Sequence, residues 1–297
     1  MSTANLTQRP DVTPAKRPTE PSKTRSTLVW LGLLALVGVS AWLSGARWSE
    51  LGSLFTEGWR YFLLMGQGLV HNPFSEPYSE YWTLAFDKMM ESVYMAWIGT
   101  LMGALISIPF GFLAARNVSG RVTVQVSRAF LNLIRAVPEL VFAIVIMLPI
   151  LGFGPLAGTV ALGVGAVGTL GKLTAEALEG IDMGPVEAVR ASGASKVSVL
   201  RWAFWSQVLP EVLAFWLYRF EINIRASAVL GVIGAGGIGS LLSQLFSKRE
   251  WEQIGITLAV IVIVTVLVDM ISGAVRHRII AGSAKSERRI QEETVAL

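Results

Sequence analysis

Six stretches of this chain are long and apolar enough to cross a lipid bilayer, and no other feature restricts its fold as strongly. A membrane-spanning helix needs about 20 mainly apolar residues. The stretches are residues 28–46, 92–115, 129–153, 156–172, 207–227 and 254–272. The sequence therefore predicts an all-α integral membrane protein with six transmembrane helices.

Composition agrees with a membrane location. Hydrophobic residues make up 53% of the 297 residues and charged residues 15%, whereas a soluble domain carries about 25% charged residues. With no cysteine, the chain has no thiolate metal site and no cysteine nucleophile. Its two histidines, His71 and His277, are too far apart in sequence to predict a zinc or haem site, so no metal site is expected.

The N-terminal region divides into a tail and a first span. Residues 1–27 are polar and rich in Pro, Thr and Ser, which predicts a disordered tail. Residues 28–46 are predicted to form the first transmembrane helix. A cleaved signal peptide is the alternative, because Ser44-Gly45-Ala46 resembles a small-residue cleavage site. The long polar lead-in favours a retained helix.

The remaining segments follow from local composition. Residues 47–91 mix aromatic and acidic side chains, which predicts an extracytoplasmic, interfacial connection with a helix near 51–70 that Asn72-Pro73 ends. Residues 92–275 are expected to form the membrane core. Within it, the glycine-rich stretch 229–246 predicts a re-entrant or short membrane helix.

The distribution of Lys and Arg predicts the orientation in the membrane. These residues gather in the N-terminal tail, the 116–128 and 172–204 loops and the tail 276–297, whereas acidic residues outnumber them in 47–88. By the positive-inside rule both termini are cytoplasmic. The sequence pI of about 9.5 therefore reflects orientation, and no nucleic-acid partner is predicted.

A short polar break lies between the fourth and fifth apolar stretches. Within 184–196, Gly184 ends the preceding segment and Pro185 suits a first helical turn. Gly193 suits a left-handed stop, and Ser195 is a good N-cap for a second helix over 196–204. The pattern predicts a helix, a turn and a helix on the cytoplasmic side.

The surface of this break is low enough for another backbone to approach closely. Glu187 places negative charge near the positive helix N-terminus, and small residues follow at Ala188, Ala191, Gly193 and Ala194. We interpret the break as a knob that docks into a groove of a soluble partner. The alternative is an ordinary cytoplasmic helical loop.

The fifth apolar stretch contains polar residues that are costly inside a membrane, namely Arg219, Glu221, Asn223 and Arg225. Arg219 lies about 20 Å along the helix from residue 206, near the middle of a core about 30 Å thick. Glu221 and Arg225 have the spacing of an internal ion pair, which leaves Arg219 as surplus positive charge. Such a charge beside a translocation path suits an anion with phosphate-like oxygens.

Packing is the alternative role for these charges, through pairing with Glu139, Glu211 or a second subunit. Arg135 and Glu139 flank Pro138 and form a second charged cluster nearer the cytoplasmic face. An interfacial salt bridge is the alternative interpretation of this cluster. Pathway contact is expected for Arg135, Glu139 and the four polar residues of the fifth stretch.

Two glycine motifs resemble nucleotide-binding sequences but lack features that such sites require. Residues 234–239 match Gly-x-Gly-x-x-Gly, but both flanks are membrane-apolar, so a close-packed bend is the better interpretation. Residues 168–173 resemble the end of a phosphate-binding loop, yet Leu173 occupies the position of the Mg²⁺-binding Ser or Thr. With no catalytic Ser-His-Asp set or acid–base carboxylate pair, no catalytic residue and no enzyme activity are predicted.

Several stretches carry a family resemblance. Glu187-Ala188-Val189 followed by Gly193 resembles the coupling loop of membrane subunits of bacterial ABC importers. Three further stretches, in the same order, are similar to phosphonate-type ABC importer permeases, over roughly residues 85–275: 135–140, 171–188 and 220–239. The resemblance implies the MetI-like type I fold, with a permease core over 92–275 and a coupling loop over 180–204.

The resemblance also implies partners and a substrate class. It implies a homodimer, two cytoplasmic ATPase subunits that bind ATP and Mg²⁺ themselves, and an extracytoplasmic substrate-binding protein, in a bacterial inner membrane. Pro185, Glu187, Ala188, Ala191, Gly193, Ala194 and Ser195 become the ATPase-coupling residues. The cargo implied is phosphonate, phosphite or phosphate. Alternatives are a permease for another small solute, an ion-gradient-driven secondary transporter or a membrane enzyme acting on lipid phosphates.

Overall fold

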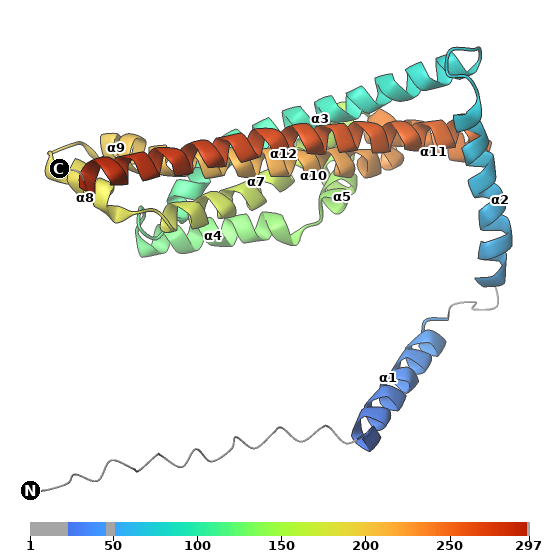
Figure 1. The fold of residues 1–297 in the computed structure, drawn as a ribbon, viewed down its shortest axis with the longest axis horizontal. Helices are drawn as coiled ribbons and strands as arrows, with labels where there is room; N and C mark the ends of the chain where they lie inside the picture. The colour runs from blue at the N-terminus through green and yellow to red at the C-terminus, as the bar shows by residue number, and fades with distance from the viewer. Residues whose placement is uncertain (1–22, 46–50, 296–297) are drawn as a thin grey trace, which may run out of the picture. The chain divides into compact units, whose positions relative to one another are not determined.

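The computed structural model describes residues 23–45 and 51–295, which form helices joined by short connections (Figure 1). The predicted all-α fold is confirmed over these residues. Residues 1–22, most of the predicted disordered tail, lie outside the described residues, as do 46–50 and 296–297.

The chain divides into two units, Met1–Trp59 and Arg60–Leu297. The first contains α1 (Lys23–Leu43), which begins before the predicted start at residue 28. Large apolar side chains on several sides of α1 are exposed, including Leu31, Val37 and Trp42, as expected for a helix surrounded by lipid. The next helix, α2 (Leu51–Val70), has the predicted bounds and continues into the second unit.

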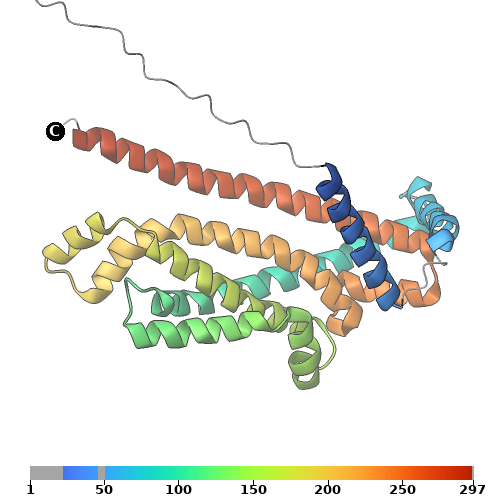
Figure 2. The same ribbon diagram turned by 90° about the horizontal axis from the view of Figure 1, so that it is seen from below.

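Four long helices run alongside one another in the second unit (Figures 1 and 2). They are α3 (Tyr78–Ala114), α7 (Pro155–Glu179), α10 (Ser206–Leu230) and α12 (Trp251–Val295). The third, α10, matches the predicted fifth span closely. The helices α3 and α12 are longer than the predicted spans 92–115 and 254–272, because hydropathy marks the apolar part of a helix and not its polar ends.

Small residues allow α3 and α7 to lie very close together. A Cβ atom at Gly103 would come within 2.5 Å of both the Ala166 Cβ and the Gly163 carbonyl oxygen. Replacing glycine at this contact would therefore push the helices apart. The prediction that the glycine-rich fourth span packs closely against its neighbours is confirmed.

The predicted third span, 129–153, is not one continuous helix but falls within a bent pair of helices that can count as one span. Its parts are α4 (Arg121–Ala136), α5 (Glu139–Phe142), the π-helical turn η2 (Ala143–Met147) and α6 (Leu148–Leu151). The two halves meet at an angle of 84°. The residue before a proline avoids the helical conformation, and Val137 before Pro138 is extended, with ψ 118°.

A second bend follows α10. The π-helical turn η4 (Gly231–Ala235) leads to α11 (Gly237–Lys248), and the helix pair bends by 56°. Gly234 has φ +100° and Gly236 has φ +81°, backbone conformations that favour glycine. A re-entrant or short membrane helix was predicted over 229–246. Four described helices can span a bilayer, or up to six if each bent pair counts as one span.

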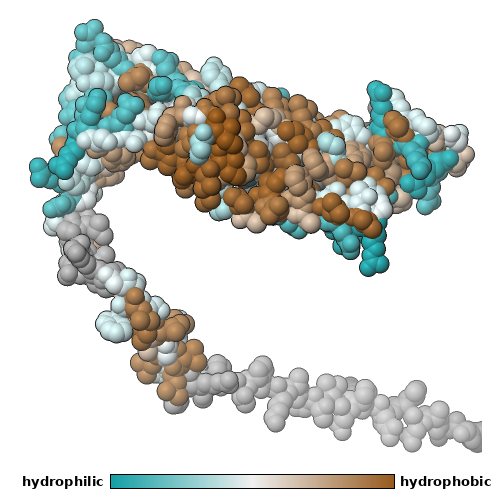
Figure 3. Space-filling view, turned by 180° about the vertical axis from the view of Figure 1, so that it is seen from behind, coloured by the Kyte–Doolittle hydropathy of each residue, from teal (hydrophilic) through white to brown (hydrophobic). Residues whose placement is uncertain are grey.

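The surface of the second unit shows where lipid would lie. On the face in Figure 3, hydrophobic side chains gather over the middle of the helices, and hydrophilic side chains gather toward the two ends. Exposed apolar side chains of α3 and α12 include Leu105, Ile106, Val262 and Ile263. An apolar middle with polar ends is typical of a membrane-spanning helical bundle.

Candidate functional site

The predicted knob forms a helix that its sequence caps at both ends. This helix, α8, spans Met183–Ala191, and the Asp182 carboxylate accepts a 2.9 Å hydrogen bond from the Gly184 N–H. Pro185 lies in the first turn, as predicted. Sequence reasoning placed the start at Pro185 and missed Asp182 as the N-cap, although Asp is one of the favoured capping residues.

The turn after α8 agrees with the prediction in its local geometry. Gly193 adopts φ +77°, the expected left-handed stop. The Ser195 hydroxyl accepts a hydrogen bond from the Ser198 N–H and caps α9 (Lys196–Val199). The chain continues through the π-helical turn η3 (Leu200–Trp205) directly into α10. After the turn at residues 192–195, the chain is thus helical from Lys196 into α10.

The knob is anchored by one side and exposed on the other. Val186 is fully buried and belongs to the same apolar cluster as Leu178 of α7 and Phe204 of η3. The predicted coupling residues Pro185, Glu187, Ala188, Ala191, Gly193 and Ser195 are exposed, and Ala194 is half-buried. The residues predicted to meet a partner therefore share an accessible surface on a well-packed support.

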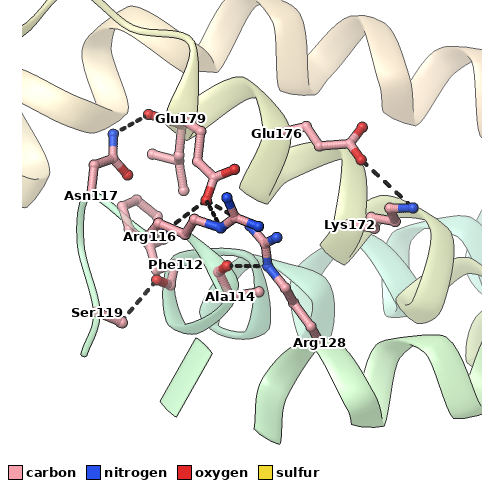
Figure 4. Close-up of polar contacts among 10 residues, drawn as sticks. Phe112, Ala114, Arg116, Asn117, Ser119, Arg128, Lys172, Glu176 and Glu179 are labelled. Atoms are coloured by element: carbon pink, nitrogen blue, oxygen red, sulfur yellow. Dashed lines mark hydrogen bonds and ion pairs between the residues drawn. The ribbon is translucent and has the colours of Figure 1, made fainter. Parts of the chain in front are cut away.

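The end of α7, just before the knob, is fixed by a polar cluster that sequence reasoning missed (Figure 4). The Glu179 carboxylate accepts hydrogen bonds from the Arg116 backbone N–H at 2.7 Å and from the Arg128 guanidinium at 2.6 Å. The Asn117 amide donates to the Leu178 carbonyl oxygen at 2.5 Å. These contacts tie α7 to the α3–α4 connection and to α4.

The deepest charge of the predicted pathway set is paired across helices. Arg219 of α10 is 7% exposed, and its guanidinium forms an ion pair with the Glu139 carboxylate of α5. Gly165 of α7 leaves room for this carboxylate, because a Cβ at Gly165 would come within 2.6 Å of the Glu139 Cγ. Within the described part of the chain, the buried Nε of Arg219 has no hydrogen-bond partner. The pair thus leaves one donor of the guanidinium available.

Arg135 lies near this pair but is not bonded to it. It lines a hollow of about 400 Å³ together with Glu139, Gly165 and Thr169. Among the described side chains, no carboxylate pairs with Arg135, and Glu139 binds Arg219 instead. The alternative of an Arg135–Glu139 salt bridge is therefore not observed. Arg135, Glu139 and Arg219 are brought to one region, between α4, α7 and α10.

The other predicted pathway charges point elsewhere. Glu221 pairs with Arg276 at 3.1 Å and Arg225 pairs with Asp269 at 2.5 Å, both partners lying on α12. The Glu221–Arg225 pair that their spacing allows is not observed among the described residues, because α12 lies beside α10 and supplies opposite charges. Asp269 is an isolated acid inside the predicted sixth span, a signal that could have identified it.

Asn223 is fully buried and donates a 2.8 Å hydrogen bond to the Thr100 hydroxyl of α3. The side-chain carbonyl oxygen of Asn223 has no hydrogen-bond partner among the residues that the structure describes. Thr100 was not predicted from the sequence, because an isolated Thr in an apolar helix carries no distinctive signal. Asn223 therefore joins α10 to α3, apart from the Arg219–Glu139 pair.

Both nucleotide-like motifs are structural. The 234–239 stretch forms the bend before α11, and α11's first N–H groups are bound by α3: Gly237 donates to the Glu91 carboxylate at 3.0 Å and Ile238 to the Ser92 hydroxyl at 2.9 Å. The predicted close-packed bend is confirmed. The 168–173 stretch is part of continuous helix α7. No group of acidic or histidine side chains able to hold a metal occurs in the residues described.

Comparison with known proteins agrees with this architecture. The chain is 39% identical over 196 residues to the phosphate-import permease protein PhnE of Mycolicibacterium smegmatis, a match that covers 66% of this chain and 37% of the relative's length. It is 40% identical to the phosphite transport system permease protein PtxC of Stutzerimonas stutzeri, covering 63% of this chain and 68% of that relative.

A solved structure shows the same fold, and a family profile shows the family to which the chain belongs. The MetNI methionine ABC transporter in an inward-facing conformation shares the fold, with a TM-score of 0.59 and 23% identity over 69% of this chain and 99% of that chain. The profile of a family described as "Binding-protein-dependent transport system inner membrane component" matches residues 107–280, more than half of the chain. The relatives and the family are transport components and not enzymes. The chain belongs to the family of binding-protein-dependent transport system inner membrane components.

Proposed function

We propose that the chain is the permease subunit of an ATP-driven importer that moves phosphonate, or a related phosphorus oxyanion such as phosphite or phosphate, across a bacterial cell membrane. The names of the Mycolicibacterium and Stutzerimonas relatives support this class of cargo. In this proposal both termini are cytoplasmic, as the distribution of basic residues indicates.

The observation that carries the proposal is the exposed helix α8, supported by α7 and α10, in a binding-protein-dependent family. A second copy of the chain, two cytoplasmic ATPase subunits and an extracytoplasmic binding protein complete the proposed complex. ATP and Mg²⁺ bind to the ATPase chains. Closure of the ATPase pair would move α8, and the spans would rock between inward-open and outward-open arrangements.

The Arg219–Glu139 pair supports an anionic cargo. Guanidinium groups bind tetrahedral oxyanions through two parallel hydrogen bonds. With no anion bound, Glu139 holds the Arg219 charge, and Arg135 supplies further positive charge at the same hollow. An arriving oxyanion would take the place of the Glu139 carboxylate on Arg219.

Uptake by proteoliposomes tests the proposal. The permease is reconstituted with its cognate ATPase and binding protein, and radiolabelled methylphosphonate, phosphite and phosphate are supplied outside. We expect ATP-dependent uptake of at least one of them, with no competition by methionine, the solute of the structural neighbour. Equal uptake without the ATPase would indicate a secondary transporter, and transport of methionine alone would contradict the oxyanion assignment.

A further inference from the structure

Helix α4 carries a line of polar side chains that the proposed function does not yet use. Their spacing of four, three, four and three residues places them on one side of the helix: Arg121, Gln125, Arg128, Asn132 and Arg135. We name this line the polar stripe of α4. Beside it runs an exposed apolar line that includes Val122, Val126 and Leu133, and the third side of α4 is buried.

The polar stripe faces a series of hollows. Beside Arg135 lies the hollow of about 400 Å³ next to the Arg219–Glu139 pair. The next, of about 160 Å³, lies among Arg128 and Asn132 of α4 and the ion-paired Lys172 and Glu176 of α7. Arg128 also lines the third, of about 530 Å³. The hollows thus follow one another from the buried pair toward the knob end of the bundle.

The third hollow is the most basic of the three. It is lined by Arg116, Arg121 and Arg128 together with Ser119 and Gln125, and no carboxylate lines it. We name it the three-arginine hollow.

Arg128 is held in place at the edge of this hollow. Its Nε donates to the Ala114 carbonyl oxygen at 2.9 Å and its Nη2 donates to Glu179 at 2.6 Å, as Figure 4 shows. These two bonds use one N–H group on Nε and one on Nη2 of Arg128, and they leave the other N–H groups of the guanidinium available to an anion. Arg121 pairs with no carboxylate among the described side chains, so positive charge is in excess.

Negative charge beside the start of α8 disfavours the other route by which an anion could leave the Arg219 region. A hollow of about 920 Å³ beside the start of α8 is lined by three carboxylates, those of Glu176, Asp182 and Glu211, and by no basic side chain. An anion that left the Arg219 region on that side would meet like charges at close range. On the α4 side the hollows are lined by basic side chains as well: Glu139 is accompanied by Arg135 in the first, Glu176 by Arg128 and Lys172 in the second, and the third has three arginines.

The membrane requires the polar stripe to face water or protein. Helix α4 runs alongside α7 in both ribbon views (Figures 1 and 2), and by length and composition α4 and the helix after Pro138 count together as one bent membrane span. Charged side chains within a membrane turn toward water-filled cavities or partners and away from lipid. The apolar line beside the stripe is the side suited to lipid or to an apolar protein surface.

We infer that the polar stripe of α4 lines a water-filled lane that conducts a phosphorus oxyanion between the Arg219–Glu139 pair and the three-arginine hollow. This inference rests on the proposed function. Successive guanidinium groups give the anion several binding positions, none of which has to be tight. Conduction requires this balance of attraction and release.

Cysteine accessibility tests the lane without any transport measurement, and the chain has no native cysteine. The variants are Gln125→Cys and Asn132→Cys on the polar stripe. The matched controls are the next residues along the helix, Val126→Cys and Leu133→Cys, whose native side chains are 64% and 66% exposed in the isolated chain. Each variant is treated in membrane vesicles with an anionic, membrane-impermeant methanethiosulfonate.

We expect the stripe positions to react about 100-fold faster than their controls, because lipid excludes both the charged reagent and the thiolate. Inorganic phosphate or methylphosphonate should slow the reaction at the stripe positions only. Equal rates at stripe and control positions would overturn the inference. Fast labelling that neither anion slows would overturn the assignment of the lane to oxyanions.

The same assay separates a free anion from a lipid headgroup, because it is repeated in vesicles with and without anionic lipid. Slowing by phosphate in neutral vesicles supports the lane. If anionic lipid slows the labelling of the stripe positions and phosphate does not, the result would contradict the lane and would assign the three-arginine hollow to a lipid phosphate. The variant Arg121→Gln should weaken the phosphate effect, whereas Arg201→Gln, an equal charge change beside Trp202, should not.

Because this assay needs neither ATP nor an ATPase, its result does not depend on uptake. A chain that fails to transport any oxyanion, but shows phosphate-sensitive labelling of the stripe, would contradict the proposed function and not the lane.

Discussion

Arg219 is the residue on which the proposed chemistry depends most directly. Its side chain is 8% exposed, and that of its partner Glu139 is 23% exposed. A buried pair is weak support for stability, but breaking it by removing one partner is strongly destabilising. A single substitution at Arg219 would therefore lower both stability and uptake, and it would not separate a packing role from a role in transport.

A double replacement separates the two roles. Arg219→Ala should destabilise the purified chain by about 3–5 kcal/mol, because Glu139 is left without its partner. Replacing both residues, Arg219→Met with Glu139→Met, should recover most of that stability but not uptake. Thermal unfolding in detergent and oxyanion uptake are measured on the same variants. Uptake that returned together with stability would limit Arg219 to a packing role.

Gly165 offers an independent perturbation of the same pair. A Cβ at this position would come within 2.6 Å of the Glu139 Cγ, so Gly165→Ala should displace the carboxylate from Arg219. We expect reduced uptake and a stability loss of about 1–3 kcal/mol, typical of overpacking. The control is Gly273→Ala on α12, where a Cβ would meet nothing within 4 Å. Identical uptake by both variants would contradict a role for the pair.

At the scale of elements, α8 and its supports form one mechanical unit. Val186 fixes α8 to the apolar cluster, Glu179 fixes the preceding end of α7, and the chain is helical from Lys196 into α10. A displacement of α8 would therefore reach the helix that carries Arg219. The Glu179–Arg128 contact connects the same region to α4.

The turn after α8 can be tested by substitution at Gly193, which has φ +77°. A residue with a Cβ is disfavoured there by about 1–2 kcal/mol, whereas asparagine tolerates this conformation. Gly193→Ala should lower the amount of oxyanion moved per ATP hydrolysed in proteoliposomes, and Gly193→Asn should stay close to the unmodified protein. Equal coupling in both variants would show that the left-handed turn does not set the position of α8.

Local signals determined the elements that the sequence predicted well. The bounds of α2, the left-handed turn at Gly193 and the Ser195 cap each depend on residues within a few positions. The 84° bend at Pro138 was missed as a bend, because hydropathy continues through it. A proline in an apolar stretch can kink a helix or break it, and the sequence alone does not distinguish these outcomes.

At the scale of the whole molecule, hydropathy and the distribution of basic residues predicted the class of protein. They did not predict contacts between residues that are far apart in the sequence. Arg219 and Glu139 are 80 positions apart, and Glu221 and Arg276 are 55 apart. For both Arg219 and Glu221, several side chains in the sequence carry the opposite charge and were candidate partners. Only the placement of α5 and α12 beside α10 selects among them. The residues predicted for the pathway consequently divide into a set near Glu139, a set paired with α12, and Asn223, which bonds to Thr100 of α3.

In the proposed complex, a cytoplasmic ATPase acts on the membrane helices through α8. The most direct measurement places one cysteine at the exposed residue Ala188, by Ala188→Cys in the cysteine-free chain. An impermeant maleimide is then added to inside-out and right-side-out membrane vesicles, with and without the ATPase subunit. We predict labelling in inside-out vesicles only, and loss of this labelling when the ATPase is bound. Labelling from the outside, or labelling that the ATPase does not change, would contradict it.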